Sequence, residues 1–290
     1  MRGQSPRSEW NNTRSATRAR HLYLRHVKFR HSVKRSPDRS PAAIKAVTLD
    51  CWGTLVVDGP ASDDRYQGER LVGIQRILAA SGVKTGRRDL DRAYLESGRR
   101  LARIWRERRD VPIRRHVEAL LRALNRDLLE RLHPRIMDEL IDAYASPALR
   151  APPAIDDGAA ASLAALVARG LILGLVSNTM RTPGVVFRQI FDRLALLAPF
   201  TVVTFSDECG VRKPDPEIFF LTVRQMGVSP GEVIHVGDDP ILDVEGARSA
   251  QLGGVIQVAA DDRAIWPVEP DAVITGLDQL PAALDRLVSS

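Results

Sequence analysis

The sequence predicts an α/β fold, in which a parallel β-sheet carries helices and an all-helical region is inserted near its start. The 290 residues, 44% of them hydrophobic, are enough for one good-sized domain with a smaller insertion. From residue 151 onward, short β-branched runs alternate with helical patterns, which is typical of βαβ units. Between residues 58 and 150 the hydrophobic periodicity is helical.

Residues 1–41 differ in charge from the rest of the chain. They carry 11 basic and 2 acidic residues, whereas residues 42–290 carry 31 basic and 34 acidic residues. The formal net charge of +6 therefore belongs to this segment, and nucleic acid is not expected as a partner of the remainder. No apolar run in the segment is long enough for a signal peptide. We expect a basic, disordered tail; a transit peptide, an anion-binding arm and a start codon placed too far upstream remain alternatives.

The first element of the core is the β-branched run at 44–49, which predicts a strand ending at Asp50. A glycine-containing turn, CWGTL, follows it. The helical domain expected at 58–150 has apolar residues at helical spacing, and it divides the core into residues 42–57 and 151–290.

Strands and helices alternate after Pro152 and Pro153. A helix over 157–168 is expected to stop at Gly170, and the apolar run that follows predicts a strand ending at Ser177. The remaining expected elements are a helix at 185–194, a strand at 201–205, a helix with Asp215 as N-cap and Pro216 in its first turn, a strand at 233–237, a helix ending at Ala250, strands at 255–258 and 272–274, and a helix from Asp278.

Polar side chains stand where the predicted strands end. Ligands of open parallel sheets bind outside the carboxyl ends of the strands, so these side chains are expected to converge. Four carboxylates in one crevice repel unless a cation lies among them. Oxygen ligands favour Mg²⁺, which shares its coordination shell with phosphate, and an ammonium and a hydroxyl are suited to hold that phosphate. The side chains are Asp50, Ser177, Asn178, Lys213, Asp238, Asp239 and Asp243.

Four segments resemble, in the same order, the motifs of the haloacid dehalogenase-like (HAD) hydrolase superfamily. They are DCWGTL, SN, RKPDP and GDDPILDVEGA, and the resemblance extends over residues 44–290. It implies a Rossmann-like core. The helical region between the first two motifs implies the α-helical cap of the dehalogenase-like subfamily.

The resemblance also implies a role for each residue of the motifs. Asp50 is expected to be the nucleophile that forms a covalent aspartyl intermediate. Ser177, with Asn178 beside it, is expected to bind the transferring group, while Lys213 balances the charges of nucleophile and phosphate. The metal is Mg²⁺, and its expected site comprises Asp50, the backbone carbonyl of Trp52, Asp238, and Asp243 as a ligand or a support.

Trp52 departs from the pattern of the phosphatases in this superfamily. They usually carry a second aspartate there, which protonates the leaving alcohol and then activates water. An indole cannot act as a general acid or base at neutral pH, and such assistance is worth about 10²–10⁴-fold. The sequence therefore predicts either a slow phosphatase or an enzyme for substrates such as acyl phosphates, whose leaving group needs no proton.

The 2-haloacid dehalogenases of the superfamily offer an alternative, because their D-x-Y-G-T motif has an aromatic residue at this place and their reaction needs no metal. Their fourth motif, however, is rich in Ser and Asn. In this chain it holds Asp238, Asp239 and Asp243, which would repel one another in a metal-free crevice. We weigh the fourth motif more heavily and expect a Mg²⁺-dependent phosphatase. A catalytically weak or silent binding protein is the alternative of another class.

Charge and composition add expectations about partners. Residues 58–150 carry 20 basic and 15 acidic residues and residues 151–290 carry 10 and 18, which is consistent with a small anionic substrate between them. The run RIWRERRD at 103–110 is interpreted as a solvated helix face. No stretch is apolar enough for a membrane span. Cys51 and Cys209 lack the spacing of a disulfide framework or a metal site, so we expect a cytoplasmic location. The oligomeric state is left open.

Overall fold

The computed structural model describes residues 43–57, 62–259 and 268–289, so the tail expected at 1–41 lies outside the described residues. Six parallel strands form one sheet in the order β3–β2–β1–β4–β5–β6. This confirms the predicted α/β class. The strands are β1 (Ala46–Leu49), β2 (Ile172–Ser177), β3 (Val202–Phe205), β4 (Val233–Gly237), β5 (Gly254–Val258) and β6 (Ala272–Ile274).

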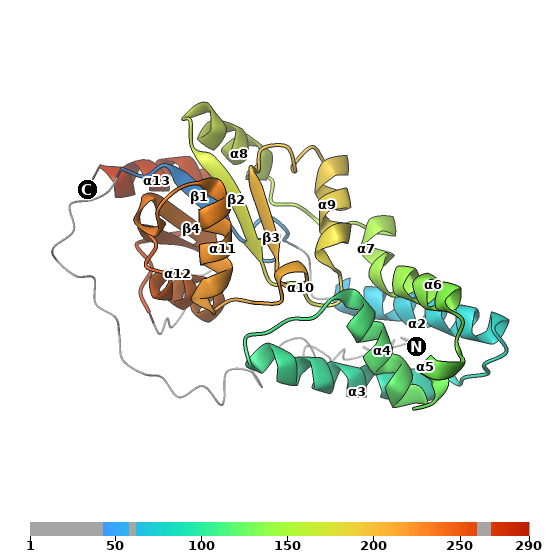
Figure 1. Cartoon of the computed structure of the whole chain (residues 1–290). Helices are drawn as coiled ribbons and strands as arrows, with labels where there is room; N and C mark the ends of the chain where they lie inside the picture. The colour runs from blue at the N-terminus through green and yellow to red at the C-terminus, as the bar shows by residue number, and fades with distance from the viewer. Residues whose placement is uncertain (1–42, 58–61, 260–267, 290) are drawn as a thin grey trace, which may run out of the picture. The chain divides into compact units, whose positions relative to one another are not determined.

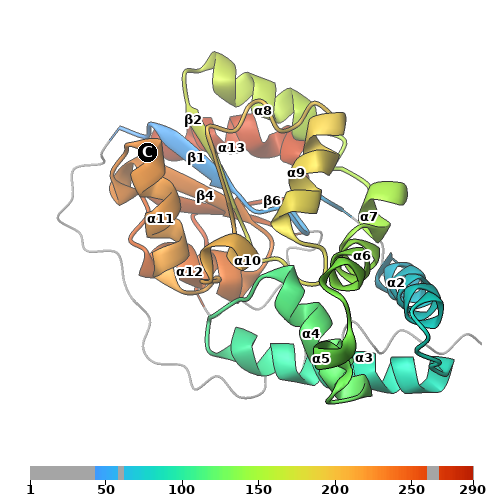
Figure 2. The same ribbon diagram turned by 45° about the vertical axis from the view of Figure 1, so that its right-hand side comes forward.

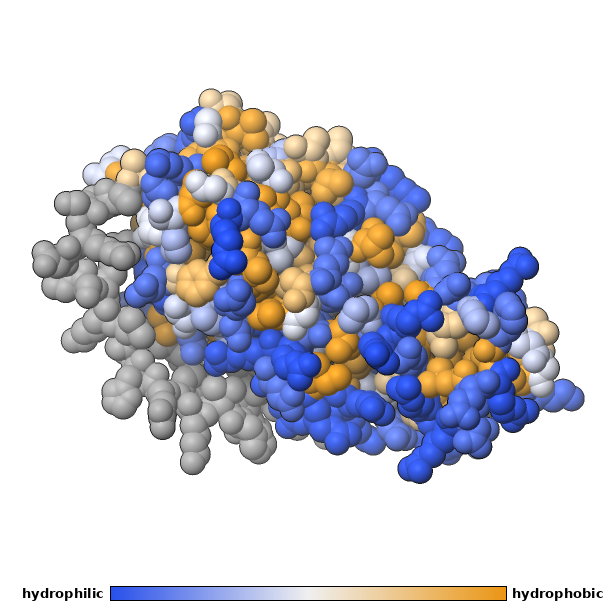
Figure 3. Space-filling model, viewed as in Figure 1, coloured by the Kyte–Doolittle hydropathy of each residue, from blue (hydrophilic) through white to orange (hydrophobic). Residues whose placement is uncertain are grey.

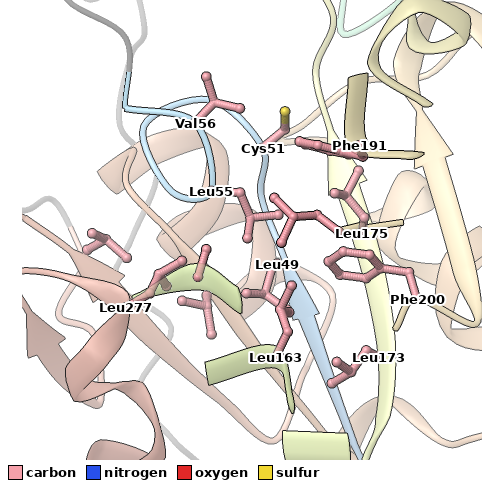
Figure 4. Packing of buried hydrophobic residues seen from close by; sticks show 14 of the residues in the cluster. Leu49, Cys51, Leu55, Val56, Leu163, Leu173, Leu175, Phe191, Phe200 and Leu277 are labelled. Atoms are coloured by element: carbon pink, nitrogen blue, oxygen red, sulfur yellow. The ribbon is translucent and has the colours of Figure 1, made fainter. Parts of the chain in front are cut away.

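Helices cover both faces of the sheet (Figure 1). Alternate side chains of a strand point to opposite faces, so Leu49 and Ala46 of β1 belong to different hydrophobic clusters. On the Leu49 face pack α8 (Ala159–Ala168), α9 (Gly184–Arg193) and α13 (Leu280–Val288). Figure 4 shows Leu49 and Leu175 there, among side chains that include Leu163 and Phe191. The other face holds α11 (Pro216–Met226) and α12 (Gly246–Ser249).

The regular elements described between residues 62 and 150 are all helices, and we call this segment the helical region. It has a hydrophobic cluster of its own, to which Leu71, Leu78, Leu121 and Leu140 contribute. It lies between β1 and α8 in the chain and contacts the core. The helices are α2 (Ser62–Ala80), α3 (Arg87–Arg106), α4 (Ile113–Leu124), α5 (Leu128–Arg131), α6 (Pro134–Ala145) and α7 (Pro147–Arg150).

Local sequence signals explain several element boundaries. Asp215 caps α11 as predicted, because its side chain accepts a hydrogen bond from the Glu217 backbone N–H at 3.0 Å. The helix expected up to Ala250 instead begins with a π-helical turn, Pro240–Glu245, before α12. The sequence analysis missed α10 (Ser206–Cys209), whose four residues carry too little periodicity to be recognised.

The strand register brings the predicted site residues to one edge of the sheet. Leu49, the last residue of β1, lies opposite Leu175 of β2 and Val236 of β4. The chain therefore leaves all three strands within two residues of that level, which places Asp50, Ser177 and Asp238 side by side.

The described surface is mostly hydrophilic where Figure 1 places α3 and α4, and apolar side chains occur there in small groups (Figure 3). Figure 2 shows the same elements after a 45° turn. Among the described residues, no helix is both long and apolar enough to span a membrane.

Candidate active site

Three carboxylates meet at the carboxyl edge of the sheet. Asp50 follows β1, where its backbone N–H donates to the Val236 carbonyl at 2.9 Å. Asp238 follows β4, and Asp243 lies in the π-helical turn behind it. One carboxylate oxygen from each of the three aspartates lies within 4.8 Å of the others. The structure thus brings together the three acidic residues that the sequence analysis assigned to the metal site.

Two glycines leave room for this arrangement. A Cβ on Gly53 would lie 2.3 Å from Cγ of Asp238, and one on Gly237 would lie 2.2 Å from Cγ of Asp243. Gly53 also has a φ of +78°, which side chains rarely permit. Larger residues at either position would therefore push a carboxylate out of the cluster.

Lys213 is the cation inside this cluster. Its Nζ lies 2.7 Å from Oδ1 of Asp50 and 2.5 Å from Oδ1 of Asp243, and the side chain is 1% exposed. Asn178 holds the lysine backbone from both sides, since its Oδ1 accepts from the Lys213 N–H at 2.8 Å and its Nδ2 donates to the Lys213 carbonyl at 2.9 Å. The Asn178 side chain therefore positions Lys213, a role that the sequence analysis did not foresee.

Both carboxylate oxygens of Asp243 are hydrogen-bonded within the protein. Besides Lys213, Oδ1 of Asp243 lies 3.0 Å from Nε2 of His235, and Oδ2 accepts from the backbone N–H of Asp239 at 2.9 Å. Nδ1 of His235 in turn contacts the Thr48 hydroxyl at 2.9 Å. These contacts identify His235 as a buried, hydrogen-bonded core residue.

Burial and charge set the pKa values of these groups in different directions. Burial raises the pKa of Asp50 to about 6; the Lys213 ammonium opposes this rise, and Asp243 adds to it. Burial alone would also raise the pKa of Asp243, but Lys213 and the His235 hydrogen bond outweigh it and hold the pKa below its ordinary value. Burial would lower the pKa of Lys213, yet the two carboxylates raise it, so the lysine is charged.

The other predicted residues lie close by with distinct surroundings. Asp239 caps the π-helical turn, because its Oδ1 accepts from the N–H groups of Ile241 and Leu242, each at 2.9 Å. Ser177 ends β2 and is 1% exposed. The Trp52 indole packs edge-to-face on Phe187 of α9, with ring centroids 5.3 Å apart, so its side chain takes part in core packing.

A divalent cation fits this set of donors. Oδ1 of Asp50 is buried and, although it lies near the lysine, has no hydrogen bond of suitable geometry, so it keeps lone pairs for another ligand. Lys213 contacts two of the three carboxylates, Asp50 and Asp243, so these four side chains together keep an excess of negative charge that a cation can balance. Oxygen donors of this kind suit Mg²⁺.

A second ionic cluster, which sequence reasoning missed, lies next to the first. Arg212 precedes Lys213 in the chain, and its Nη1 contacts Oδ2 of Asp110 in the helical region at 2.7 Å. The only local signal was that Asp110 ends the charged run at 103–110. Arg106, Arg108 and Arg109 are exposed as expected of a solvated face, whereas Asp110 is 5% exposed.

The family model of the haloacid dehalogenase-like hydrolases matches residues 44–251. The chain belongs to this family. Curated relatives of this HAD hydrolase include the haloacid dehalogenase-like hydrolase domain-containing protein 3 of Danio rerio, 32% identical over 126 residues, which are 43% of this chain and 50% of the relative. Another is the phosphoserine phosphatase of Thermus thermophilus, 36% identical over 139 residues, which are 48% and 52% of the two chains. The HAD hydrolase thus spans about half the length of these relatives.

Solved structures share the fold of this HAD hydrolase over most of its length. The 2-haloacid dehalogenase from Pseudomonas syringae pv. Tomato has a TM-score of 0.62 and 24% sequence identity, and covers 84% of this chain and 99% of its own. The HAD phosphatase from Thermococcus onnurineus has a TM-score of 0.53 and 23% sequence identity. The match covers 83% of this chain and 98% of the phosphatase chain. At these identities the likeness establishes the fold, and the site must establish the chemistry.

Proposed function

We propose that this HAD hydrolase is a Mg²⁺-dependent phosphatase that acts on a small anionic substrate through an aspartyl-phosphate at Asp50. One observation carries the proposal: oxygens of Asp50, Asp238 and Asp243 lie within 4.8 Å of one another, with Lys213 as the cation among them. A carboxylate cluster with this charge needs a further cation. A metal-free dehalogenase would have to bear the repulsion without it.

The chain's own residues account for the transfer to Asp50. A carboxylate oxygen of Asp50 attacks phosphorus, the bond from phosphorus to the leaving oxygen breaks, and water then hydrolyses the acyl phosphate. Lys213 touches the nucleophile and offers a positive charge to the phosphoryl oxygens, while Ser177 offers a hydroxyl at the end of the neighbouring strand.

Asp50, Asp238 and the backbone carbonyl of Trp52 are the proposed ligands of Mg²⁺, and Asp243 supports them. When bound, Mg²⁺ supplies charge neutralisation for the phosphoryl oxygens. The support role of Asp243 rests on its contacts, since both of its oxygens already accept hydrogen bonds from the protein.

Trp52 leaves the proposed phosphatase without the usual acid at this position. Its indole packs on Phe187 and has no group that could protonate a leaving alcohol. Acyl phosphates, whose leaving groups are weak bases, are therefore the favoured substrate class, and alkyl phosphates should react slowly.

We further propose that the helical region is a cap domain with the sequence boundaries 58–150, and that residues 42–57 and 151–290 form the core. Its separate hydrophobic cluster supports a distinct folding unit. The basic charge of this segment opposite an acidic core supports an anionic substrate. The cytoplasmic location inferred from the two cysteines remains a prediction.

A 2-haloacid dehalogenase is the second candidate, because Trp52 stands at the aromatic position of the D-x-Y-G-T motif of those enzymes. Here Asp50 would attack carbon and displace halide without a metal. A silent binding protein, which has kept the fold and lost the acid, is the candidate outside the enzymes.

One assay separates these three candidates. The purified full-length protein is offered acyl phosphates, alkyl phosphates and 2-haloacids, each with Mg²⁺ and with a chelator, and released phosphate and halide are measured. We expect phosphate release that Mg²⁺ supports and the chelator abolishes. Halide release in chelator would identify the dehalogenase, and no turnover together with Mg²⁺ binding that Asp238→Asn weakens would indicate a binding protein.

A further inference from the structure

We propose that Asp110 is a positioning residue, through which the helical region holds the two loops that carry Lys213 and the Ser177–Asn178 pair. The inference rests on the proposed function for its activity readout only. Residues 108–111 contact the core segment 206–213 directly, and this segment in turn contacts Thr179. The loop between α3 and α4 lies beside α10 in both views (Figures 1 and 2).

The first contact is a backbone connection between distant parts of the chain. Arg109 and Val211 form an antiparallel bridge. The Asp110 N–H donates to the Gly210 carbonyl at 2.9 Å, and the Arg212 N–H donates to the Arg108 carbonyl at 3.1 Å. The helical region therefore adds a short strand-like pairing to the segment that leads directly into Lys213.

The Asp110 side chain then fills the space under this pairing. Its Oδ2 accepts from Nη1 of Arg212 at 2.7 Å and from the Ser206 hydroxyl at 2.5 Å. Its Oδ1 accepts from Nε1 of Trp105 at 2.9 Å and from the Val111 N–H at 2.8 Å. Each carboxylate oxygen thus has two donors, and its side chain is fully buried.

The same network reaches the loop that follows β2. The Ser206 hydroxyl accepts from the Thr179 N–H at 2.8 Å, and Nη1 of Arg212 donates to the Thr179 carbonyl at 3.1 Å. Thr179 comes directly after Asn178, whose amide holds the Lys213 backbone. Asp110 is therefore joined, through Arg212 and Ser206, to both loops of the site.

Arg212 makes more contacts than its salt bridge with Asp110 alone. The guanidinium of Arg212 also lies 4.7 Å from the centroid of the Trp105 ring, so aromatic stacking and two kinds of hydrogen bond fix its direction. Arg212 and Thr179 each border a residue of the proposed site in the chain. A carboxylate that fixes both should act on catalysis through the placement of Lys213, because displacements of about 1 Å can cost about 10²-fold in rate.

The test compares Asp110→Asn and Ser206→Ala with Asp138→Asn in the full-length protein. Asp138 serves as the control, because it forms an exposed salt bridge of 2.7 Å with Arg114 elsewhere in the helical region. We expect Asp110→Asn to lower kcat by about 10–100-fold with KM changed less than about 3-fold, and Ser206→Ala to lower kcat less. Asp138→Asn should leave both constants unchanged.

Hydrogen exchange supplies the readout that does not depend on activity. In Asp110→Asn and Ser206→Ala, amides of residues 177–182 and 206–213 should exchange at least about 10-fold faster, while those of β5 keep the wild-type rate. If the proposed phosphatase activity is wrong, wild-type protein shows no turnover and exchange alone decides the proposal. A uniform rise across the protein, or unchanged exchange with unchanged kcat, would overturn it. If Asp110→Asn fails to fold, Ser206→Ala decides by the same two criteria.

Discussion

Arg212 and Lys213 are neighbours in the chain, and each is the cation of an ionic cluster; the two clusters differ in their balance of charge. Around Lys213, the carboxylates of Asp50, Asp238 and Asp243 gather at one edge of the sheet. Around Arg212, its guanidinium contacts the carboxylate of Asp110, and four donors fill the two oxygens of that carboxylate.

In the proposed function, the cluster around Lys213 takes part in the reaction, whereas the cluster around Arg212 holds the backbone in place. A buried cluster with excess negative charge is unfavourable until a cation joins it, so its stability should respond to metal and to every change of charge. A balanced and fully hydrogen-bonded pair needs no further ligand and can fix a backbone. Substitutions that alter the charge of one cluster while the other stays intact therefore test the distinction.

Asp50→Asn should cause the largest change in activity. The amide cannot attack phosphorus as a carboxylate does, so Mg²⁺-dependent phosphate release should fall by at least about 10³-fold. Lys213 keeps its contact with Asp243 in this variant, so the fold should persist. Phosphate release and a thermal unfolding curve measure the two effects.

Asp50→Asn with full Mg²⁺-dependent turnover of phosphate compounds would refute the role of Asp50. A loss of turnover that coincides with a loss of folded protein would reveal a structural effect instead. Asp239→Asn is the matched control, because the asparagine oxygen can still cap the turn that Asp239 caps.

Lys213→Met should cause the largest change in stability. Without the ammonium, the buried carboxylates of Asp50 and Asp243 lose their cation beside the partly buried Asp238, which should cost about 3–5 kcal/mol of unfolding free energy. Added Mg²⁺ should restore part of this loss, so the difference in Tm with and without Mg²⁺ should exceed that of the wild type.

Lys45→Met is the control for Lys213→Met, since Lys45 makes a 2.6 Å salt bridge to Glu232 with 59% of its side chain exposed. Its loss should cost less than about 1 kcal/mol. Equal effects of the two substitutions, or no response of Lys213→Met to Mg²⁺, would contradict the charge argument.

The sequence revealed one of the two clusters and not the other, for a physical reason. Residues at strand ends are predictable, because parallel strands bring their carboxyl ends to one edge of the sheet. On this ground alone, Asp50, Ser177 and Asp238 could be expected close together, and the strand register agrees. Asp110 and Arg212 are 102 residues apart, and no periodicity pairs them. In the sequence, Asp110 is only the last residue of an arginine-rich run.

Local geometry explains the finer limits of sequence reasoning. The position of Asp239 beside Asp238 at the strand end does not by itself exclude it as a ligand, and only the resemblance assigned Asp238 and Asp243 alone; in the structure the Asp239 side chain accepts hydrogen bonds from the Ile241 and Leu242 N–H groups of the π-helical turn. Such a turn has no signature in the hydrophobic pattern. Likewise, the order of strands and helices was predictable, whereas the four-residue α10, which places Ser206 beside Asp110, was not.

Trp52→Asp tests whether the Lys213 cluster lacks a general acid. We expect turnover of alkyl phosphates to rise by at least about 10-fold, with the 10²–10⁴-fold that acid–base assistance can supply as the upper limit, and turnover of acyl phosphates to change little. The variant loses a ring contact with Phe187, so a lower Tm accompanies the gain. Trp52→Phe keeps a ring without an acid and should leave both rates unchanged. Unchanged alkyl phosphate turnover in Trp52→Asp would show that the missing acid does not limit the rate.

The smallest effect is expected at Asp207. Its carboxylate adjoins the Arg212–Asp110 pair, and among the described residues it has no cation of its own. It is 8% exposed, and its Oδ1 accepts from the Gly184 N–H at 3.1 Å. Burial raises its pKa to about 6 from an ordinary 3.8, although the Gly184 hydrogen bond opposes the rise. The folded protein therefore binds the proton more tightly than the unfolded chain does between these pH values.

The sign of the pH dependence follows from this difference. Protonated Asp207 contributes stability that is fully present below about pH 3.8 and is lost as the pH rises to about 6. Within this window the free energy of unfolding falls by no more than about 1.4 kcal/mol per pH unit. Asp207→Asn keeps an acceptor for Gly184 and cannot ionise. Its unfolding free energy should match that of the wild type near pH 4 and exceed it by about 1–2 kcal/mol at pH 7. Denaturant unfolding across this range measures the difference, with the exposed Asp138→Asn as control. A difference that stays constant with pH would mean that Asp207 is no less ionised in the folded protein than in the unfolded chain, and the contrast between balanced and unbalanced carboxylates would then not extend to it.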